Sequence, residues 1–210
     1  MNLTTETAKK WFLAAGREIQ ENKGYLSELD QAIGDGDHGH NMARGFSEVE
    51  KKIASETYED VGGVVKDASM TIISKVGGAA GPLYGTAFLK ASGVWKNKST
   101  LSDEEFAEGL KAAIEGIAKR GKSEQGQKTM LDVWIPVLEE AEKGSIDVHQ
   151  LVRTAKEAME KTKDIEAKKG RAAYLGDRSI GHLDPGAYSS YLLFEALAEA
   201  VDEEGEESNG

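Results

Sequence analysis

The chain contains no cysteine among its 210 residues. A disulfide scaffold is therefore excluded, and so is a zinc or iron–sulfur site with cysteine ligands. Long hydrophobic runs are also missing, since no stretch approaches the ~18 uncharged apolar residues that a membrane-spanning helix needs. The first twenty residues carry charges among their apolar positions, which a secretory signal does not. We expect a cytoplasmic protein with no membrane-spanning segment.

Basic residues are too few to balance the acidic ones: 26 lysines and arginines face 37 aspartates and glutamates, a net charge of −11. Such a chain does not attract nucleic acid through general electrostatics, and anionic membranes repel it. We therefore expect neither nucleic acid nor a membrane as a partner. Proline is scarce, with 3 residues, but glycine is abundant, with 24. The glycines are clustered, and these clusters carry the functional signal.

Apolar residues recur at helical spacing along most of the chain, and no convincing strand is present. Phe106, Leu110 and Ile117 are one example, and they follow a capping box formed by Ser102 and Glu105. Predicted helices occupy residues 3–20, 23–31, 40–54, 60–76, 82–96, 103–120, 129–143, 147–166 and 185–202. The short loops between them make consecutive helices antiparallel.

The length is typical of one domain, and neither an internal repeat nor a linker divides the chain. We predict a single all-helical domain over residues 1–202. Residues 203–210 are acidic and lack apolar side chains, so we predict a disordered tail there.

Two glycine patterns match nucleotide-binding motifs by letters alone. Residues 34–39 fit G-x-G-x-x-G, but a predicted helix rather than a strand precedes them. Residues 116–123 fit a P-loop, but they lie at the end of the helix predicted over 103–120. The dipole at the C-terminal end of a helix disfavours phosphate. We therefore reject the P-loop for its position and the G-x-G-x-x-G motif for the missing strand.

Three aspartates without a basic neighbour follow one another closely: Asp30, Asp35 and Asp37. Gly34 and Gly36 favour leaving the helix, and an extended chain then places Asp35 and Asp37 on one side, roughly 6.6 Å apart. A turn can fold them back over Asp30. Converging carboxylates favour a hard divalent cation such as Mg²⁺, Ca²⁺ or Mn²⁺. The alternative is a solvated acidic turn with an aspartate as helix cap.

Residues 76–82 are small and join two predicted helices. Small residues let a ligand approach the backbone, and a helix start offers free N–H groups to an anion. This segment is therefore a candidate phosphate cradle. The alternative is a tight turn in which the small residues only permit close packing.

The longest irregular stretch, residues 168–186, is rich in glycine and basic residues. Arg171 and Arg178 are candidates for binding phosphate. Asp184 fits the cap of the helix that begins at Pro185. The alternative is a flexible basic loop. His38 lies in the glycine-rich segment that holds Asp35 and Asp37. A histidine there suits either a nucleotide contact or a phosphohistidine carrier.

Together these segments predict a pocket for metal and polyphosphate. Three carboxylates and ADP (about −3) bring a charge of about −6, and two Mg²⁺ ions supply +4. A pair of ions is therefore favoured over a single one.

The four segments LDQAIGDGDHGHNMARGF, SKVGGAAGPLYGTAF, RGKSEQGQKTMLDVW and KKGRAAYLGDRSIGHLDPGA together resemble one family. It is the family of nucleotide-binding subunits of bacterial dihydroxyacetone kinases that depend on the phosphotransferase system. The resemblance runs in order from about residue 5 to 200. The free-standing length favours this form over the C-terminal domain of single-chain, ATP-dependent kinases.

The resemblance implies an all-α fold, an antiparallel up-and-down barrel of about eight helices with the nucleotide at one end. It also implies that ADP stays tightly bound as a cofactor with Mg²⁺, for which the balance of charge favours two ions. A phosphocarrier subunit of the phosphotransferase system rephosphorylates this ADP. The phosphoryl group then passes to dihydroxyacetone held on a separate kinase subunit. Two copies of the chain could pair as a homodimer.

The resemblance further assigns residues to roles. Its magnesium ligands match Asp30, Asp35 and Asp37. Its nucleotide contacts match His38, Gly39, His40, Asn41, Ala79, Ala80, Gly121, Met130, Arg171, Asp184, Pro185 and Gly186. No residue is expected to act as a nucleophile. Some relatives carry serine where this chain has Ala80, so a main-chain N–H must bind phosphate here.

Two alternatives remain open at this stage. The first is a nucleotide domain that uses exchangeable ATP for another acceptor, such as a fatty acid. The second is a nucleotide-sensing regulator that performs no chemistry.

Overall fold

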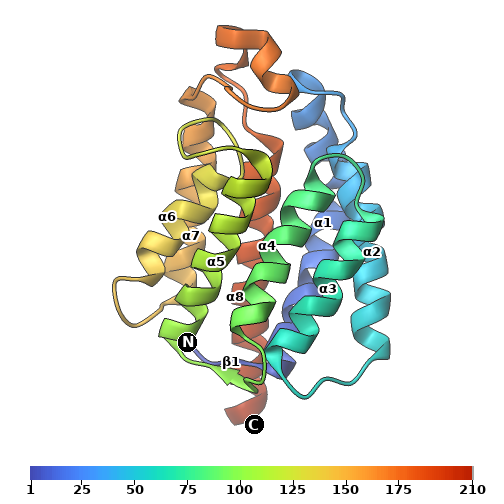
Figure 1. Ribbon diagram of the computed structural model, residues 1–210, viewed down its shortest axis with the longest axis vertical. Helices are drawn as coiled ribbons and strands as arrows, with labels where there is room; N and C mark the ends of the chain where they lie inside the picture. Colours follow the sequence, from blue (N-terminus) through green and yellow to red (C-terminus); the bar gives the residue numbers. More distant parts are fainter. Residues whose placement is uncertain (210) are drawn as a thin grey trace.

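Helices dominate the structure, a computed structural model that describes the backbone of residues 1–209 (Figure 1). The α-helices of the described part are α1 Thr5–Ile33, α2 His38–Ser55, α3 Val61–Lys75, α4 Ala80–Val94, α5 Asp103–Gly121, α6 Leu131–Ala141, α7 Val148–Lys161 and α8 Pro185–Asn209. Two 3₁₀ segments, η1 Thr162–Asp164 and η2 Arg171–Ser179, lie between α7 and α8. The all-α class is confirmed, and so is the count of about eight helices that the resemblance implies.

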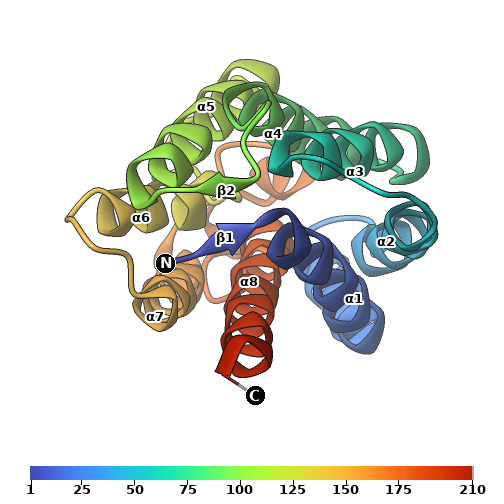
Figure 2. The same ribbon diagram turned by 90° about the horizontal axis from the view of Figure 1, so that it is seen from below.

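The eight α-helices pack in the order of the sequence. Each one contacts the next, and α8 also packs against α1, which gives the ring seen from below in Figure 2. Aromatic side chains fill the space between helices far apart in sequence. Trp134 of α6 packs edge-on against Phe88 of α4 and Phe194 of α8, with ring centroids 5.9 and 5.3 Å apart. This core fixes the ring on which the loops are mounted.

The first helix is longer than the sequence pattern predicts. Residues 3–20 and 23–31 are predicted as two helices, but residues 5–33 form the single helix α1. Gly24 lies inside it and disfavours helix by only ~1 kcal/mol relative to alanine, less than packing against α2 and α8 supplies. The helix also begins later, because Thr4 is its N-cap and Leu3–Thr4 forms strand β1.

A short sheet was not expected from the sequence. Strand β1 pairs antiparallel with β2, Thr100–Leu101, so that Leu3 lies opposite Leu101. Each strand has only two residues, too few to give an alternating apolar pattern. The pair ties the start of the chain to the loop between α4 and α5.

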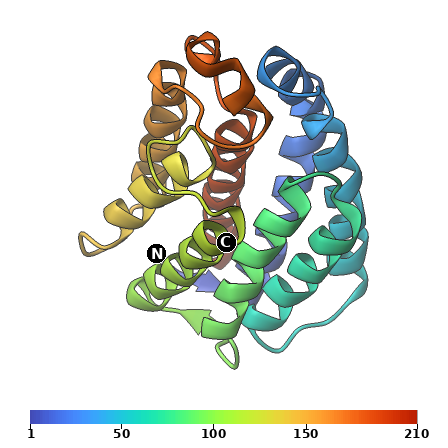
Figure 3. The same ribbon diagram turned by 45° about the horizontal axis from the view of Figure 1, so that its top comes forward.

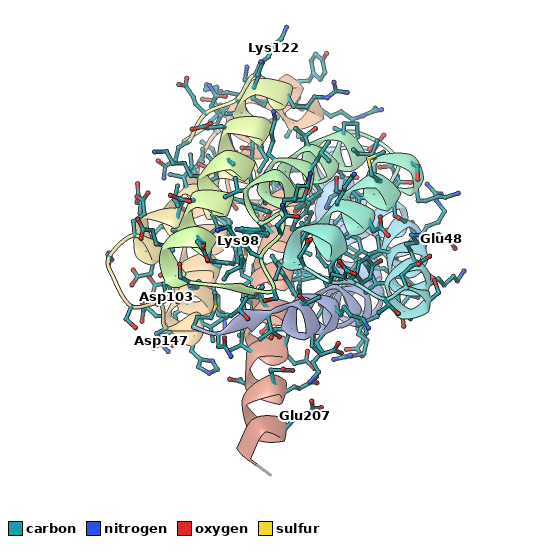
Figure 4. All side chains as sticks on the ribbon, turned by 60° about the horizontal axis from the view of Figure 1, so that its bottom comes forward. Glu48, Lys98, Asp103, Lys122, Asp147 and Glu207 are labelled. Carbon is teal, nitrogen blue, oxygen red and sulfur yellow. The ribbon has the colours of Figure 1, made fainter. Side chains whose placement is uncertain are left out.

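The acidic C-terminal segment, predicted as a disordered tail from residue 203, instead continues α8 to Asn209. Lys10 of α1 lies 3.0 Å from Glu204 and 2.6 Å from Glu207, so charge pairing with α1 supports the extra turns. Glu207 marks this part of α8, which extends beyond the other helices in Figure 4. Gly210, also predicted in the tail, lies outside the described residues.

The two ends of the ring differ. The chain ends and the β1–β2 pair lie at one end, and loops 34–37, 76–79, 122–130 and 162–184 gather at the other (Figures 1 and 3). These four loops contain the segments that the sequence singles out. No helix in the described part of the chain is long and apolar enough to cross a membrane.

Candidate metal and nucleotide site

Three aspartates meet where α1 ends. Asp30 lies in the last turn of α1, and Asp35 and Asp37 lie in and at the end of the loop that follows. One carboxylate oxygen from each lies within 4.8 Å of the other two. Asp30 Oδ2 also accepts hydrogen bonds from the main-chain N–H groups of Asp37 (2.9 Å) and His38 (3.1 Å). Asp30 thus folds the loop back over the helix end, as the spacing predicts.

Two glycines make this loop sterically feasible. A Cβ atom at Gly34 would lie 2.2 Å from Asp30 Oδ1, so any larger residue would push the carboxylate away. Gly36 has φ +78°, in the region that other residues adopt only under strain. The aspartate cluster therefore depends on glycine at both positions.

The chemistry of the cluster suits a hard divalent cation. Its donors are carboxylate oxygens, which Mg²⁺ prefers. In the part of the chain that the structure describes, one basic side chain pairs with the cluster: Arg171 of η2, whose guanidinium lies 2.9 Å from Asp35 Oδ2. Both of these side chains are exposed, and a single guanidinium does not balance three carboxylates. The residues present therefore fit Mg²⁺.

A polar cavity of about 470 Å³ opens beside the aspartates. Ala79 and Ala80 at the start of α4 also line it, and Lys169 and Arg171 line it from the segment before α8. No side chain caps the start of α4 at Ala79, so its first main-chain N–H groups remain available. An uncapped helix start with basic side chains nearby can bind an anionic oxygen.

A second cavity, of about 450 Å³, adjoins the polar one. Leu83, Ile117 and Met130 give it apolar walls. The two cavities share six lining residues: His38, Ala79, Ala80, Lys169, Gly170 and Asp184. A polar compartment beside an apolar one can accommodate a ligand with a charged end and a flat apolar end.

Most of the residues predicted to contact a nucleotide line these cavities. They are His38, Asn41, Ala79, Ala80, Gly121, Met130, Arg171, Asp184, Pro185 and Gly186. Gly39 and His40 line neither cavity. A Cβ at Gly39 would lie 1.9 Å from the Lys23 carbonyl oxygen, so this glycine lets α2 approach α1. His40 is exposed on α2.

The imidazole of His38 is held by buried hydroxyl groups. Its Nε2 lies 3.0 Å from Ser189 Oγ, which lies 2.6 Å from Tyr84 OH. Tyr84 OH also contacts Ser190 Oγ at 2.8 Å, and Ser190 accepts a hydrogen bond from Trp134 Nε1. Burial lowers the pKa of His38 and favours the neutral ring, although nearby aspartates oppose this shift. The network fixes the imidazole of His38 at the boundary between the two cavities.

Asp184 caps α8, as the sequence predicts. Its Oδ2 accepts a hydrogen bond from the Ala187 N–H at 2.7 Å. Burial raises the pKa of this carboxyl from 3.8 to about 7, against the effects of the Ala187 hydrogen bond and of the charge on Lys128. At neutral pH the charge of the Asp184 carboxyl therefore depends on the charged groups next to it.

Sequence reasoning missed several residues of the cavities. Lys169 lines both of them and Lys128 lines the apolar one. Lys128 lies within one of the family-like segments, but lysine is usually exposed, and nothing in its spacing indicates burial. A basic residue between a glycine and an apolar run is too common a signal to have identified it.

Comparison with known proteins identifies relatives along nearly the whole chain. The family described as "DAK2 domain" matches residues 32–199. A Listeria innocua protein named PEP-dependent dihydroxyacetone kinase 1, ADP-binding subunit DhaL, is 52% identical over 198 residues, which cover 94% of this chain and 97% of the relative. The Escherichia coli protein named PEP-dependent dihydroxyacetone kinase, ADP-binding subunit DhaL, is 40% identical, with 97% of this chain and 100% of the relative covered.

A solved structure shares the fold. It is the dihydroxyacetone kinase of C. freundii in complex with AMP-PNP and Mg²⁺, which superposes with a TM-score of 0.73 at 20% identity. The match covers 92% of this chain and 33% of that longer one. This helical fold therefore also occurs as one part of a larger kinase chain.

Proposed function

The chain belongs to the DAK2-domain family, in the group of ADP-binding subunits of PEP-dependent dihydroxyacetone kinases, and from this we propose how its site works. It holds ADP tightly at the loop end of the helical ring. A phosphocarrier subunit of the phosphotransferase system transfers a phosphoryl group to this ADP. The resulting terminal phosphoryl group then passes to dihydroxyacetone held on a separate subunit.

One observation carries the proposal. Three carboxylate oxygens within 4.8 Å of one another share a cavity with the uncapped start of α4, and an apolar cavity adjoins it. Asp30, Asp35 and Asp37 would hold Mg²⁺, two ions by the balance of charge. When bound, these ions would neutralise phosphate oxygens and so favour attack at phosphorus.

The other residues of the site bind and orient. The main-chain N–H groups at the start of α4 donate to phosphate oxygens, where Ala80 offers no hydroxyl of its own. Lys169 and Arg171 add positive charge from the segment before α8, and the apolar cavity takes the base. Phosphoryl transfer depends chiefly on positioning and charge neutralisation. The chain therefore needs no nucleophile of its own.

The proposal is tested by reconstitution. The purified chain is combined with the dihydroxyacetone-binding subunit, the phosphocarrier and a phosphoenolpyruvate-driven donor, and dihydroxyacetone phosphate is measured. We expect product, with the bound ADP failing to exchange with labelled ATP. Rapid exchange together with ATP-driven product would favour a self-sufficient kinase domain. Bound ADP without product would favour a regulator.

Two finer points belong to the same proposal. The reaction takes place in the cytoplasm, where the phosphotransferase system delivers its phosphoryl groups, and cell fractionation tests this. Pairing into a homodimer is tested by the mass of the purified chain in solution, measured with and without the dihydroxyacetone-binding subunit.

A further inference from the structure

Lys128 is a buried lysine in the loop between α5 and α6. Only 2% of the residue is exposed, although lysine almost always reaches water. Its backbone has φ +61°, a left-handed conformation that a side chain at Cβ disfavours. A buried ammonium costs several kcal/mol in lost hydration. A methionine would fill the same space without that cost, so the charge itself needs an explanation.

The ammonium group of Lys128 bonds to main-chain carbonyls rather than to a carboxylate. It donates to the main-chain carbonyl oxygen of Thr162 at 2.5 Å and to that of His182. Among the described residues no aspartate or glutamate lies within ion-pair distance of it. Charge-assisted bonds to two carbonyls from different turns are a means of holding backbone in place.

The two carbonyls belong to the two ends of one segment, residues 162–184, which we call the strap. The strap carries Lys169, Arg171 and Asp184 to the cavity walls. Its ends also contact each other, because the Asp184 N–H donates to Thr162 Oγ1 at 3.1 Å. Lys128 therefore closes the strap at its base.

The loop that carries Lys128 is itself held rigidly. Asp132 accepts hydrogen bonds from the N–H groups of Gly126 (2.5 Å) and Thr129 (2.7 Å). A further main-chain bond joins Lys168 of the strap to Gln127 of the loop, at 3.1 Å. The lysine is thus anchored on both sides of its main chain and reaches across to the strap.

We propose that Lys128 is a positioning residue for nucleotide retention, whose ammonium holds the strap closed over the two cavities. The inference rests on the proposed function, since it concerns the same nucleotide site. Without the ammonium, the Thr162 and His182 carbonyls lose their buried donor. The strap then opens more often, and ADP escapes faster.

The absence of cysteine allows a direct test, because Lys128→Cys creates the only thiol in the chain. Alkylation in denaturant with 2-bromoethylamine, followed by refolding, restores an ammonium at nearly the length of lysine. Iodoethane gives a similar side chain without charge. The readouts are the rate of ADP release in Mg²⁺ and the hydrogen exchange of strap amides.

We expect the ethylated protein to release ADP at least about tenfold faster, with faster exchange in the strap. Aminoethylation should return both rates to within about threefold of the unmodified chain. Lys168→Cys, treated in the same two ways, is the matched control. Lys168 is exposed on the strap and pairs with Glu166 at 2.7 Å, so neither of its forms should alter ADP release.

The inference is overturned if the ethylated protein retains ADP like the unmodified chain. It is also overturned if aminoethylation restores thermal stability but not retention, since Lys128 would then act on folding alone. If the ethylated protein does not fold, hydrogen exchange of the unmodified chain provides the test. Its strap and residues 122–130 should exchange as one unit, and separate opening free energies contradict the inference. Failure of the unmodified chain to hold ADP would instead remove the proposed function.

Discussion

The three aspartates carry the site, but their local roles differ. Asp30 accepts two main-chain hydrogen bonds that shape the loop after α1. Asp35 has one charged partner among the described residues, the exposed guanidinium of Arg171. Asp37 begins α2 without a side-chain capping bond. Asp30 therefore supports both the loop and the proposed metal site, whereas Asp37 has no structural task in the loop that its carboxylate must fulfil.

Replacing Asp37 should abolish ligand retention and leave the fold intact. We expect Asp37→Ala to lose Mg²⁺-dependent ADP binding, because one of three converging carboxylates is gone, with unfolding free energy nearly unchanged. Asp30→Ala should lose binding and also ~1.5–3 kcal/mol of stability, because two N–H groups lose a charged acceptor. Equilibrium dialysis with ADP and urea denaturation measure the two effects. Stoichiometric ADP on purified Asp37→Ala would show that the metal assignment is wrong.

The buried carboxyl of Asp184 should make stability depend on pH. Its pKa is about 7 in the folded chain, above the ordinary 3.8, so the folded state binds the extra proton. Stability then decreases as pH rises from about 4 to about 7, because ionisation is harder in the folded state. Asp184→Asn removes this loss, so its stability relative to the unmodified chain should increase across that window. Urea titrations in EDTA without nucleotide test this, and parallel pH curves for the two proteins would refute it.

At the scale of elements, helix positions were readable from sequence, and helix ends were less so. Apolar spacing located all eight α-helices, because each must bury one face in the ring. The division of α1 at residues 20–23 was wrong, because Gly24 faces open space and its weak preference against helix is overridden by packing on both sides. Local propensity cannot register contacts with α2 and α8.

The candidate site was predictable to a similar degree. Asp30, Asp35 and Asp37 were identified because the segment that holds them is rich in glycine and has no basic residue close to them. Few purely structural roles require that combination. The packing role of Gly39 was not predictable, since a glycine needed for helix contact and one needed for a ligand look alike in sequence. Lys128 was missed, because only the folded chain brings Thr162 and His182 to it.

The two kinds of helical glycine should respond oppositely to alanine. Gly24→Ala should stabilise the chain by ~0.5–1 kcal/mol, because nothing lies within 4 Å of the new methyl group. Gly39→Ala should destabilise it by ~1–3 kcal/mol, since the methyl would overlap the Lys23 carbonyl and force α1 and α2 apart. Urea denaturation of both variants provides the comparison. Equal shifts in the same direction would contradict the close α1–α2 approach.

At the scale of the whole molecule, structure and ligand binding are separated along the ring. The N- and C-termini lie at the end away from the four loops that form the cavities (Figure 1). Under the proposed function, the subunits that exchange a phosphoryl group with bound ADP approach from the loop end.

A folded domain fused after the C-terminus should leave ADP retention unchanged. The end of α8 that precedes the fusion point lies beyond the other helices, remote from both cavities. The rate of ADP release from the fused and unfused chains, measured in Mg²⁺, gives the comparison. A release rate changed by tenfold or more would mean that the C-terminal end takes part in retention.

The most direct measurement of the central claim is the native mass of the purified chain, before and after a chelator removes divalent ions. The account predicts one ADP and two Mg²⁺ ions bound to each chain, all lost together on chelation, because the three aspartates hold the nucleotide only through the ions. A bare chain in the presence of Mg²⁺ and ADP, or ADP that stays bound after every ion has gone, would contradict it.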